Sequence, residues 1–337
     1  FGLKAGFWPL HIWLPLAHPA APAAASAVLS GAMIKAGILG IWRFLPAEDV
    51  LLQEWANWLL AIGGISAFYG VLLGLLQHRA KAALAYSSVS QIGYLLIILA
   101  LGWQQPDARP AAALMLALYG VHHGLAKGAL FMGAGLSAHA RLSGWHWALM
   151  AVPALALAGL PLTTGAAVKV LLKDSVENSL PSLWLSVLSF GSLATLLVVA
   201  RALWLMHQTQ KTEALPAPPA SQLLPWGLLC LAPLALPWLW SEMREALQQS
   251  LPGYALWAAT WPLSAGLVLV GLAIGLGWRI PGPLRHLPSP ARAGSIRFKR
   301  WMTRPPKPAP AQPANTQRWR HLERRWNRAF QPDAVAT

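Results

Sequence analysis

Long apolar runs, separated by short charged or proline-rich breaks, follow one another along most of the chain. Several runs reach about 20 residues, the length that a helix needs to cross a hydrocarbon layer about 30 Å thick. The runs do not alternate with period two, so the strands of a membrane barrel are disfavoured. The pattern predicts an all-α, polytopic transmembrane helix bundle. The predicted spans are residues 1–12, 22–45, 55–76, 82–101, 112–136, 147–172, 182–206, 222–240 and 254–278.

Helix-breaking residues interrupt two of the predicted spans. Pro9 lies inside span 1–12, and a Gly- and Pro-containing stretch at residues 159–165 divides span 147–172. Broken helices at membrane depth free backbone groups that protein or water must satisfy, and they are typical of transporters. We therefore expect discontinuous helices near residues 1–12 and 147–172. Because the first apolar run is already under way at Phe1, without a charged leader, we interpret the chain as a C-terminal fragment with no cleavable signal.

Charges between the predicted spans alternate in sign. The junctions at residues 78–81, Arg141 and Lys211 are basic, whereas those at residues 48–54 and 174–177 are acidic. The positive-inside rule then places the basic junctions in the cytoplasm, and counting spans puts the C-terminal tail on the same side. We expect a multi-pass protein of a bacterial inner (plasma) membrane with a cytoplasmic tail.

Composition supports a membrane location and excludes thiolate chemistry. The chain is 56% hydrophobic and 11% charged, with a mean hydropathy of +0.46, so it has too few polar residues to coat a water-soluble globule. The single cysteine, Cys230, rules out a disulfide or a cysteine metal site within the chain. We expect no cofactor and no metal ion.

The basic character of the chain belongs to its tail. Residues 279–337 hold 13 Lys/Arg and 2 Asp/Glu, which accounts for most of the net charge of +15. A Pro-rich linker at 304–313 precedes a segment with an apolar helical face and a basic surround. That pattern fits a helix on an anionic lipid surface and equally a solvated basic tail, whereas nucleic-acid binding is disfavoured. The apolar face consists of Trp319, Leu322, Trp326 and Phe330.

Four lysines lie inside apolar runs rather than at their edges: Lys4, Lys35, Lys127 and Lys169. A charged lysine near mid-bilayer costs about 2.5–3.5 kcal/mol on insertion scales, so its retention needs a reason. Removal from water disfavours the ammonium form, and such an amine can accept and release protons. Snorkelling or a packing ion pair explains one such lysine as well as proton transfer does, but explains four in separate spans poorly.

A pair of histidines accompanies one of these lysines. His123 precedes Lys127 by one helical turn, so the two side chains share a face and can exchange a proton directly or through one water. A metal site is disfavoured because no membrane carboxylate or thiol stands at ligand spacing from His122 and His123. A polar cluster at residues 86–91 begins the next helix upstream, where capping and helix packing are the favoured roles and ordering of water the alternative.

These residues closely resemble the antiporter-like subunits of respiratory complex I, of Mrp-type cation/proton antiporters and of membrane-bound hydrogenases of the hydrogenase-4 or formate hydrogenlyase type. The resemblance covers about residues 1–205. The matching positions are residues 4–15, Ala17, His18, Ala21, Pro22, Ser26, Leu29, Ser30, Gly31, Lys35, Gly37, residues 85–88, Ser90, Gln91, Gly93, Tyr94, residues 123–125, Lys127, Leu130, Phe131, Gly135, residues 159–161, Gly165 and Lys169.

The resemblance implies a proton relay. It assigns Lys4 to a pair with a glutamate that would precede this chain, Lys35, His123 and Lys127 to a central relay, and Lys169 to the distal exit. It implies a translocating domain at 1–205, additional transmembrane helices at 206–278 and a basic cytoplasmic tail at 279–337. The expected partners are membrane subunits of a multisubunit complex, a soluble redox arm reached indirectly, and anionic lipid at the tail.

The residues and the resemblance together predict a proton-translocating subunit of a redox-driven complex, of the NADH:quinone oxidoreductase or hydrogenase type, with no redox chemistry in this chain. A Mrp-type Na⁺/H⁺ antiporter subunit uses the same groups, but sodium favours carboxylate oxygens, which the spans nearly lack. A membrane scaffold remains the alternative of another class, although a scaffold would gain by replacing its buried lysines with leucine. A solute carrier would need a midplane pocket that the sequence does not indicate.

The tail gives the first testable prediction. Replacing Arg324, Arg325 and Arg328 with glutamine weakens binding of the tail to anionic vesicles at low salt, because attraction to the headgroups falls with each lost charge. Vesicle co-sedimentation at low and high salt measures the effect. Equal binding by the triple variant and the unaltered tail would contradict an electrostatic association.

Overall fold

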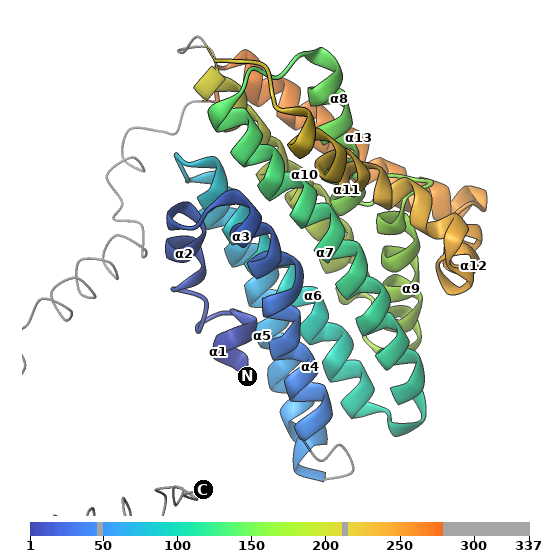
Figure 1. The fold of residues 1–337 in the computed structure, drawn as a ribbon. Coiled ribbons are helices and arrows are strands. Elements are labelled where there is room, and N and C mark those ends of the chain that lie inside the picture. Colours follow the sequence, from blue (N-terminus) through green and yellow to red (C-terminus); the bar gives the residue numbers. More distant parts are fainter. Residues whose placement is uncertain (46–49, 211–214, 279–337) are drawn as a thin grey trace, which may run out of the picture. The chain divides into compact units, whose positions relative to one another are not determined.

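The computed structural model describes residues 1–45, 50–210 and 215–278, and within these ranges the chain is helical with no strands, as predicted (Figure 1). The predicted tail, 279–337, and its surface helix lie outside the described residues. The elements are α1 (Gly2–Ala5), α2 (Leu14–Ala20), α3 (Ala23–Val28), the π-helix η1 (Leu29–Met33), α4 (Ile34–Phe44), α5 (Val50–Leu75), α6 (Ala80–Gln104), the 3₁₀ turn η2 (Pro106–Ala108), α7 (Arg109–His139), α8 (Gly144–Ala158), α9 (Thr164–Ser179), α10 (Leu183–Gln210), α11 (Ala220–Leu239), α12 (Ser241–Gln249) and α13 (Gly253–Gly275).

Six helices of the described residues are long and apolar enough to cross a membrane, where the sequence predicted nine spans. The predicted span 112–136 lies inside α7, which is long enough but less apolar, because it carries two histidines and a lysine. The predicted spans 1–12 and 147–172 are divided into shorter pieces. The six are Ala23–Phe44, Gln53–Leu75, Ala80–Gln104, Leu183–Gln210, Ala220–Leu239 and Gly253–Gly275.

Both predicted discontinuous helices are present. The helix α1 ends at Gly6, whose φ of 73° is left-handed, and the chain turns through Pro9 before α2 begins. The helix α8 ends at Gly159, with φ of 98°, and α9 begins at Thr164, after Thr163 has capped it by accepting the backbone N–H of Gly165 at 3.2 Å. Left-handed conformations favour glycine, so these two glycines stop their helices at defined residues.

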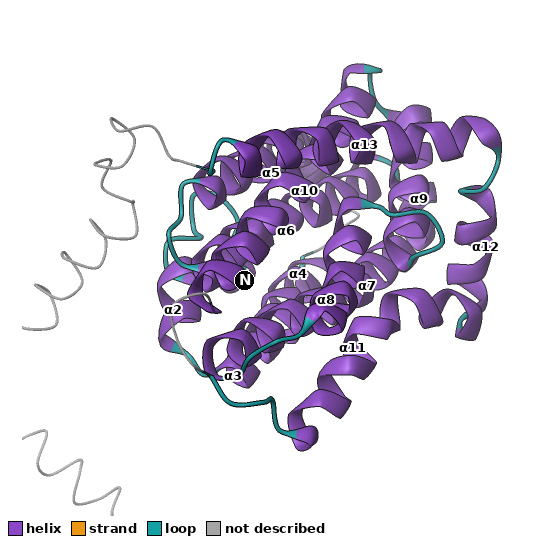
Figure 2. Cartoon of the chain, turned by 90° about the horizontal axis from the view of Figure 1, so that it is seen from above, coloured by secondary structure: helices purple, strands orange, loops and turns teal. Residues whose placement is uncertain are grey.

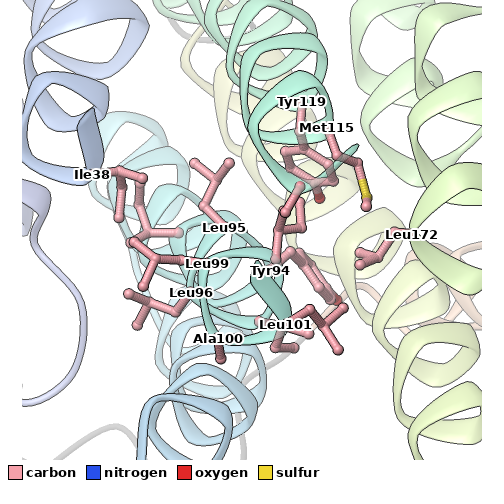
Figure 3. Close-up of a cluster of buried hydrophobic side chains, with 14 of the residues drawn as sticks. Ile38, Tyr94, Leu95, Leu96, Leu99, Ala100, Leu101, Met115, Tyr119 and Leu172 are labelled. Carbon is pink, nitrogen blue, oxygen red and sulfur yellow. The ribbon is translucent and has the colours of Figure 1, made fainter. Parts of the chain in front are cut away.

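The helix α6 forms the centre of the bundle (Figure 2). Every residue from 82 to 103 is buried, and α6 packs against α2, α5, α7 and α10. A helix that is apolar on all sides belongs in a core. On one side its Leu95, Leu96 and Leu99 meet Ile38 of α4, and Tyr94 lies toward α7 and α9, as Figure 3 shows.

Glycines allow α5 and α6 to touch through their backbones. A Cβ on Gly93 would lie 2.4 Å from the carbonyl oxygen of Gly63 and 2.8 Å from the backbone nitrogen of Ala67. A Cβ on Gly70 would lie 2.6 Å from the backbone nitrogen of Ser90. Small residues of this kind let membrane helices approach closely and gain dispersion contacts.

The amphipathic helix α12, between α11 and α13, was not predicted; residues 241–253 were left outside the expected spans. It buries Met243, Ala246 and Leu247 and packs against α9 and α11. Its polar sequence is too short to give a membrane signal, and only its packing on α9 reveals its place (Figure 2).

The glycine contact gives a prediction for stability. The substitution Gly93→Val forces α5 away from α6, and overpacking of this kind costs about 1–3 kcal/mol, so the thermal midpoint of the detergent-purified protein falls by about 3 °C or more. The matched control is Gly271→Val on α13, where an added Cβ meets nothing within 4 Å. Equal midpoints for the two variants, followed by tryptophan fluorescence, would show that the close approach is not needed.

Candidate functional site

Lys127 lies fully buried between α7 and α6. Its Nζ donates to the carbonyl oxygen of Leu84 at 2.8 Å and to the hydroxyl oxygen of Ser87. Both acceptors are neutral, and Lys127 forms no ion pair with any described residue. The ammonium is therefore solvated by protein oxygens without being neutralised, which keeps its proton exchangeable.

His123 shares a face with Lys127 but is not hydrogen-bonded to it. Within the described part of the chain neither ring nitrogen of His123 has a hydrogen-bond partner, although the ring is completely buried. Lys127 instead turns toward α6. The expected direct exchange between the two side chains is therefore absent from this geometry, and transfer through one water stays a prediction.

Lys35 is the second residue of α4, which directly follows the π-helix η1. Its Nζ donates to the carbonyl oxygen of Ser30, within that π-helix. Its aliphatic part faces α7, where a Cβ on Gly120 would lie 3.8 Å from its Cγ. The hydroxyl of Ser30 pairs with that of Ser88 on α6 at 2.9 Å. A π-helical turn shifts the register of backbone acceptors and recurs at functional sites.

Lys169 is positioned by the break between α8 and α9. Its half-buried side chain lies over Gly159, where a Cβ would come within 2.9 Å of Lys169 Cδ. Its Nζ donates to the hydroxyl of Ser192 on α10 at 2.9 Å. The left-handed glycine thus both ends α8 and leaves the space that the lysine occupies.

A polar network between α6, α7 and α10 lies beside Lys169. The Tyr119 hydroxyl donates to Gln91 Oε1 at 2.8 Å, and Gln91 Nε2 donates to the hydroxyl of Thr195 at 3.0 Å. A cavity of about 10 Å³ separates Tyr94 and Tyr119 from Lys169. That volume is at the lower limit for one water molecule. The predicted cluster at 86–91 is therefore buried and bonded across helices rather than capping one.

His122 was not among the predicted relay residues, and the structure brings it to the second broken helix. Its Nδ1 lies 2.7 Å from the hydroxyl oxygen of Thr164, the first residue of α9. Its ring contacts Tyr119 edge-on, with centroids 6.0 Å apart. The sequence signal that could have identified His122 is its position next to His123. Adjacent residues of a helix lie on different faces, and His122 lies on the face of α7 toward α9.

Two further histidines, His11 and His18, matched the family motif but were not assigned to the site. Both are buried, and none of their ring nitrogens has a hydrogen-bond partner among the described residues. His18 stacks on Phe131 of α7 with centroids 4.2 Å apart, and His11 meets Tyr69 of α5 edge-on at 4.9 Å. His18 of α2 therefore lies against α7, four residues beyond Lys127 in that helix, whereas His11, which precedes α2, lies against α5.

Lys4 departs from the expectation of a buried lysine. It is exposed on α1, which packs against α4, and it forms no ion pair with the described residues. A four-residue helix covers too little surface to enclose a long side chain. Lys4 therefore lies apart from the other predicted residues, and its pairing with a glutamate outside this chain stays a prediction.

Apart from Lys4, the lysines and histidines of the site follow one another through the bundle, and each interacts electrostatically with the next. The series runs from α6 and α2, through α7, to α9, and Lys35 of α4 interacts with both α7 histidines. One end lies at the basic junction before α6 and the other near the acidic end of α9. In order, the series is Lys81, His18, Lys127, His123, His122, Lys169 and Lys173.

Buried lysines and histidines beside broken helices are typical of membrane subunits that move ions through a helical bundle. Residues 1–197 match the family described as NADH:quinone oxidoreductase/Mrp antiporter, transmembrane, and the chain belongs to this family. The predicted resemblance is thereby confirmed.

Individual relatives give the same result. Over 188 residues the chain is 37% identical to hydrogenase-4 component B of Escherichia coli (strain K12), covering 49% of this chain and 28% of that protein. It is 32% identical to NADH-quinone oxidoreductase subunit M of Rhodobacter capsulatus over 223 residues, covering 62% and 41% respectively. The chain thus spans less than half the length of either relative. The Mrp complex from Dietzia sp. DQ12-45-1b shares the fold, with a TM-score of 0.59 and 22% identity over 99% of this chain and 40% of that one.

The break beside Lys169 gives a prediction. The substitution Gly159→Ala strains a left-handed residue by about 1–2 kcal/mol and crowds Lys169, so hydrogen exchange at the start of α9 becomes several-fold faster. The control, Gly144→Ala, places a Cβ where nothing lies within 4 Å. Mass spectrometry of peptides covering residues 160–168 measures the exchange, and unchanged protection in Gly159→Ala would contradict the assigned packing.

Proposed function

We propose that the chain is the proton-translocating part of a membrane subunit in a redox-driven complex, of the NADH:quinone oxidoreductase or hydrogenase type. Protons move along Lys35, His123, Lys127 and Lys169. Lys4 pairs with a glutamate in the part of the subunit that precedes this chain. Electron transfer takes place in partner subunits. The family and the identities to a hydrogenase component and a quinone oxidoreductase subunit support this proposal.

The observation that carries the proposal is the series of buried and half-buried amines and imidazoles that form no ion pair with a carboxylate among the described residues. Lys127 is completely buried, and its hydrogen bonds go to a carbonyl and a hydroxyl oxygen. A scaffold would be more stable with leucine in that position, because a buried unpaired cation costs several kcal/mol. A requirement for proton exchange explains its presence.

Repulsion between neighbouring amines drives the stepwise transfer. Two unit charges about 8 Å apart interact by about 2 kcal/mol at an effective dielectric constant of about 20, which shifts a proton equilibrium more than tenfold. Protonating Lys127 therefore disfavours a charge on Lys35, with which it interacts. A conformational or electrostatic change in a partner that moves one charge is passed on through the series.

The proposed setting is a bacterial inner membrane, with the basic junctions and the tail in the cytoplasm. The proposed partners are other membrane subunits, a soluble redox arm reached through them, and anionic lipid at the tail. Residues 1–205 act as the translocating domain and residues 206–278 as additional helices. The helix α10 continues across that proposed boundary to Gln210.

A Mrp-type Na⁺/H⁺ antiporter subunit is the second candidate, favoured by the shared fold with a Mrp complex. Sodium requires several oxygen ligands, carboxylates above all. No group of three or more possible His, Cys, Asp or Glu ligands occurs among the described residues. Sodium dependence of proton flux separates the two candidates.

The proposal predicts a loss of proton transport in Lys127→Ala. In vesicles that hold the intact complex, proton pumping falls at least about tenfold, because a relay group is missing from the series, while the complex still assembles. A pH-sensitive dye reports pumping, and electron transfer is measured in the same sample. The control is Ser137→Ala, a buried residue on the same helix whose hydroxyl donates to the Ala134 carbonyl. If pumping and electron transfer both persist in Lys127→Ala, Lys127 is a packing residue, and the result favours a membrane scaffold over a proton-translocating subunit.

A further inference from the structure

Beyond Lys169, the same face of α9 carries a second lysine and then acidic residues. Lys173 follows one helical turn later, and its half-buried Nζ donates to the carbonyl oxygen of Ala258 on α13 at 3.1 Å. Glu177 follows after another turn and is exposed, as is Asp174 beside it. Positions four residues apart rise about 6 Å along a helix, so these two turns lead stepwise from the half-buried Lys169 to the surface.

A cavity of about 440 Å³ lies along this face of α9. Lys169, Lys173 and Glu177 line one wall, and Ser189 and Ser192 of α10 a second. The rest is lined by the end of α8 at Gly159, by Gln249 at the end of α12 and by α13. Since a water molecule occupies about 30 Å³ of liquid, the cavity holds several waters, and its amines, hydroxyls and carboxylates supply their partners. This cavity therefore joins Lys169, the last residue of the predicted relay, to the acidic end of α9.

The wall made by α12 and α13 lies beyond residue 197, where the family match ends. It is nevertheless firmly built, because Met243, Ala246 and Leu247 of α12 share one apolar cluster with Leu172 and Val176 of α9. That cluster lies on the opposite side of α12 from the exposed residues Glu245 and Gln248. The additional helices thus complete the cavity instead of only extending the bundle.

We propose that this cavity is the aqueous exit of the proton path, and that Lys173 is its last relay residue. The inference rests on the proposed function, which ended at Lys169. A proton leaves the Lys169 ammonium for a cavity water, is taken up by the Lys173 amine, and passes to water between Asp174 and Glu177. No bond other than N–H and O–H changes, and no electron moves.

The chemistry of the lining suits an exit. Lys173 interacts electrostatically with Lys169, so a charge on one expels a proton from the other. The Ala258 carbonyl holds the Lys173 ammonium without neutralising it. The carboxylates at the mouth attract the released proton and keep anions out. By the positive-inside rule this acidic end faces away from the cytoplasm, opposite the basic end of the series.

Cysteine labelling tests whether the cavity is aqueous, independently of transport. Cys230 is buried and is the only cysteine of the chain, so a Cys230→Ser background leaves single engineered thiols. In the intact complex in proteoliposomes, Ser189→Cys reacts with a charged methanethiosulfonate at least about tenfold faster than Leu267→Cys, a control at an exposed apolar position of α13. Equal rates, read from the mass of this chain, would overturn the aqueous cavity.

Transport tests the role of Lys173. Proton flux in the same vesicles falls several-fold in Lys173→Ala and is restored by Lys173→His, which can carry a proton, but not by Lys173→Gln. The control Glu245→Gln removes a charge from α12 outside the cavity and leaves flux unchanged. Loss in Lys169→Ala with full flux in Lys173→Ala and Lys173→Gln overturns the exit but not the proposed function. Full flux in Lys127→Ala, Lys169→Ala and Lys173→Ala overturns the proposed function itself, whatever the labelling shows.

Discussion

The rest of the structure depends on how ammonium groups inside the helix bundle are held by neutral oxygens. The Lys127 amine has a carbonyl and a hydroxyl, Lys35 a carbonyl, Lys169 a hydroxyl and Lys173 a carbonyl. A carboxylate at any of these sites would trap a proton and a charge together, whereas an oxygen dipole stabilises the charge moderately. The helices must therefore bring backbone and hydroxyl oxygens to the amines, and the π-helix η1 and the break at Gly159 serve that end.

The irregularities fall next to the amines. The π-helix η1 lies beside Lys35, and the left-handed Gly159 lies under Lys169. Between them α6 offers polar groups to several neighbours at once: Ser87 to α7, Ser88 to η1 and Gln91 to α7 and α10. Because α6 is buried on every side and touches α5 through glycine, these groups have little freedom to move, which keeps the distances between the side chains of the proposed relay fixed.

Much of the fold was predictable from local sequence, because apolar run length and helix-breaking residues both act locally. The spans at residues 22–45, 55–76 and 182–206 agree with the structure to within a few residues, as does the break marked by Gly159. Tertiary details were not predictable. Helical periodicity places Lys127 and His123 on one face, but only the packing of α6 decides that Lys127 turns away from His123. The His122 contact with Thr164 and the position of α12 also depend on elements distant in sequence.

Complete burial of α6 also bears on the order in which the bundle enters the membrane. The hairpin of α5 and α6 is apolar and precedes α7 in the chain, so it can insert on its own during synthesis. The helix α7 carries a lysine and two histidines and would partition poorly alone. When α7 emerges, the oxygens of Leu84 and Ser87 that receive Lys127 are already at membrane depth. The hydrogen bonds that hold Lys127 against α6 are thus available to α7 on its insertion, and the same bonds hold the central amine of the proposed proton relay.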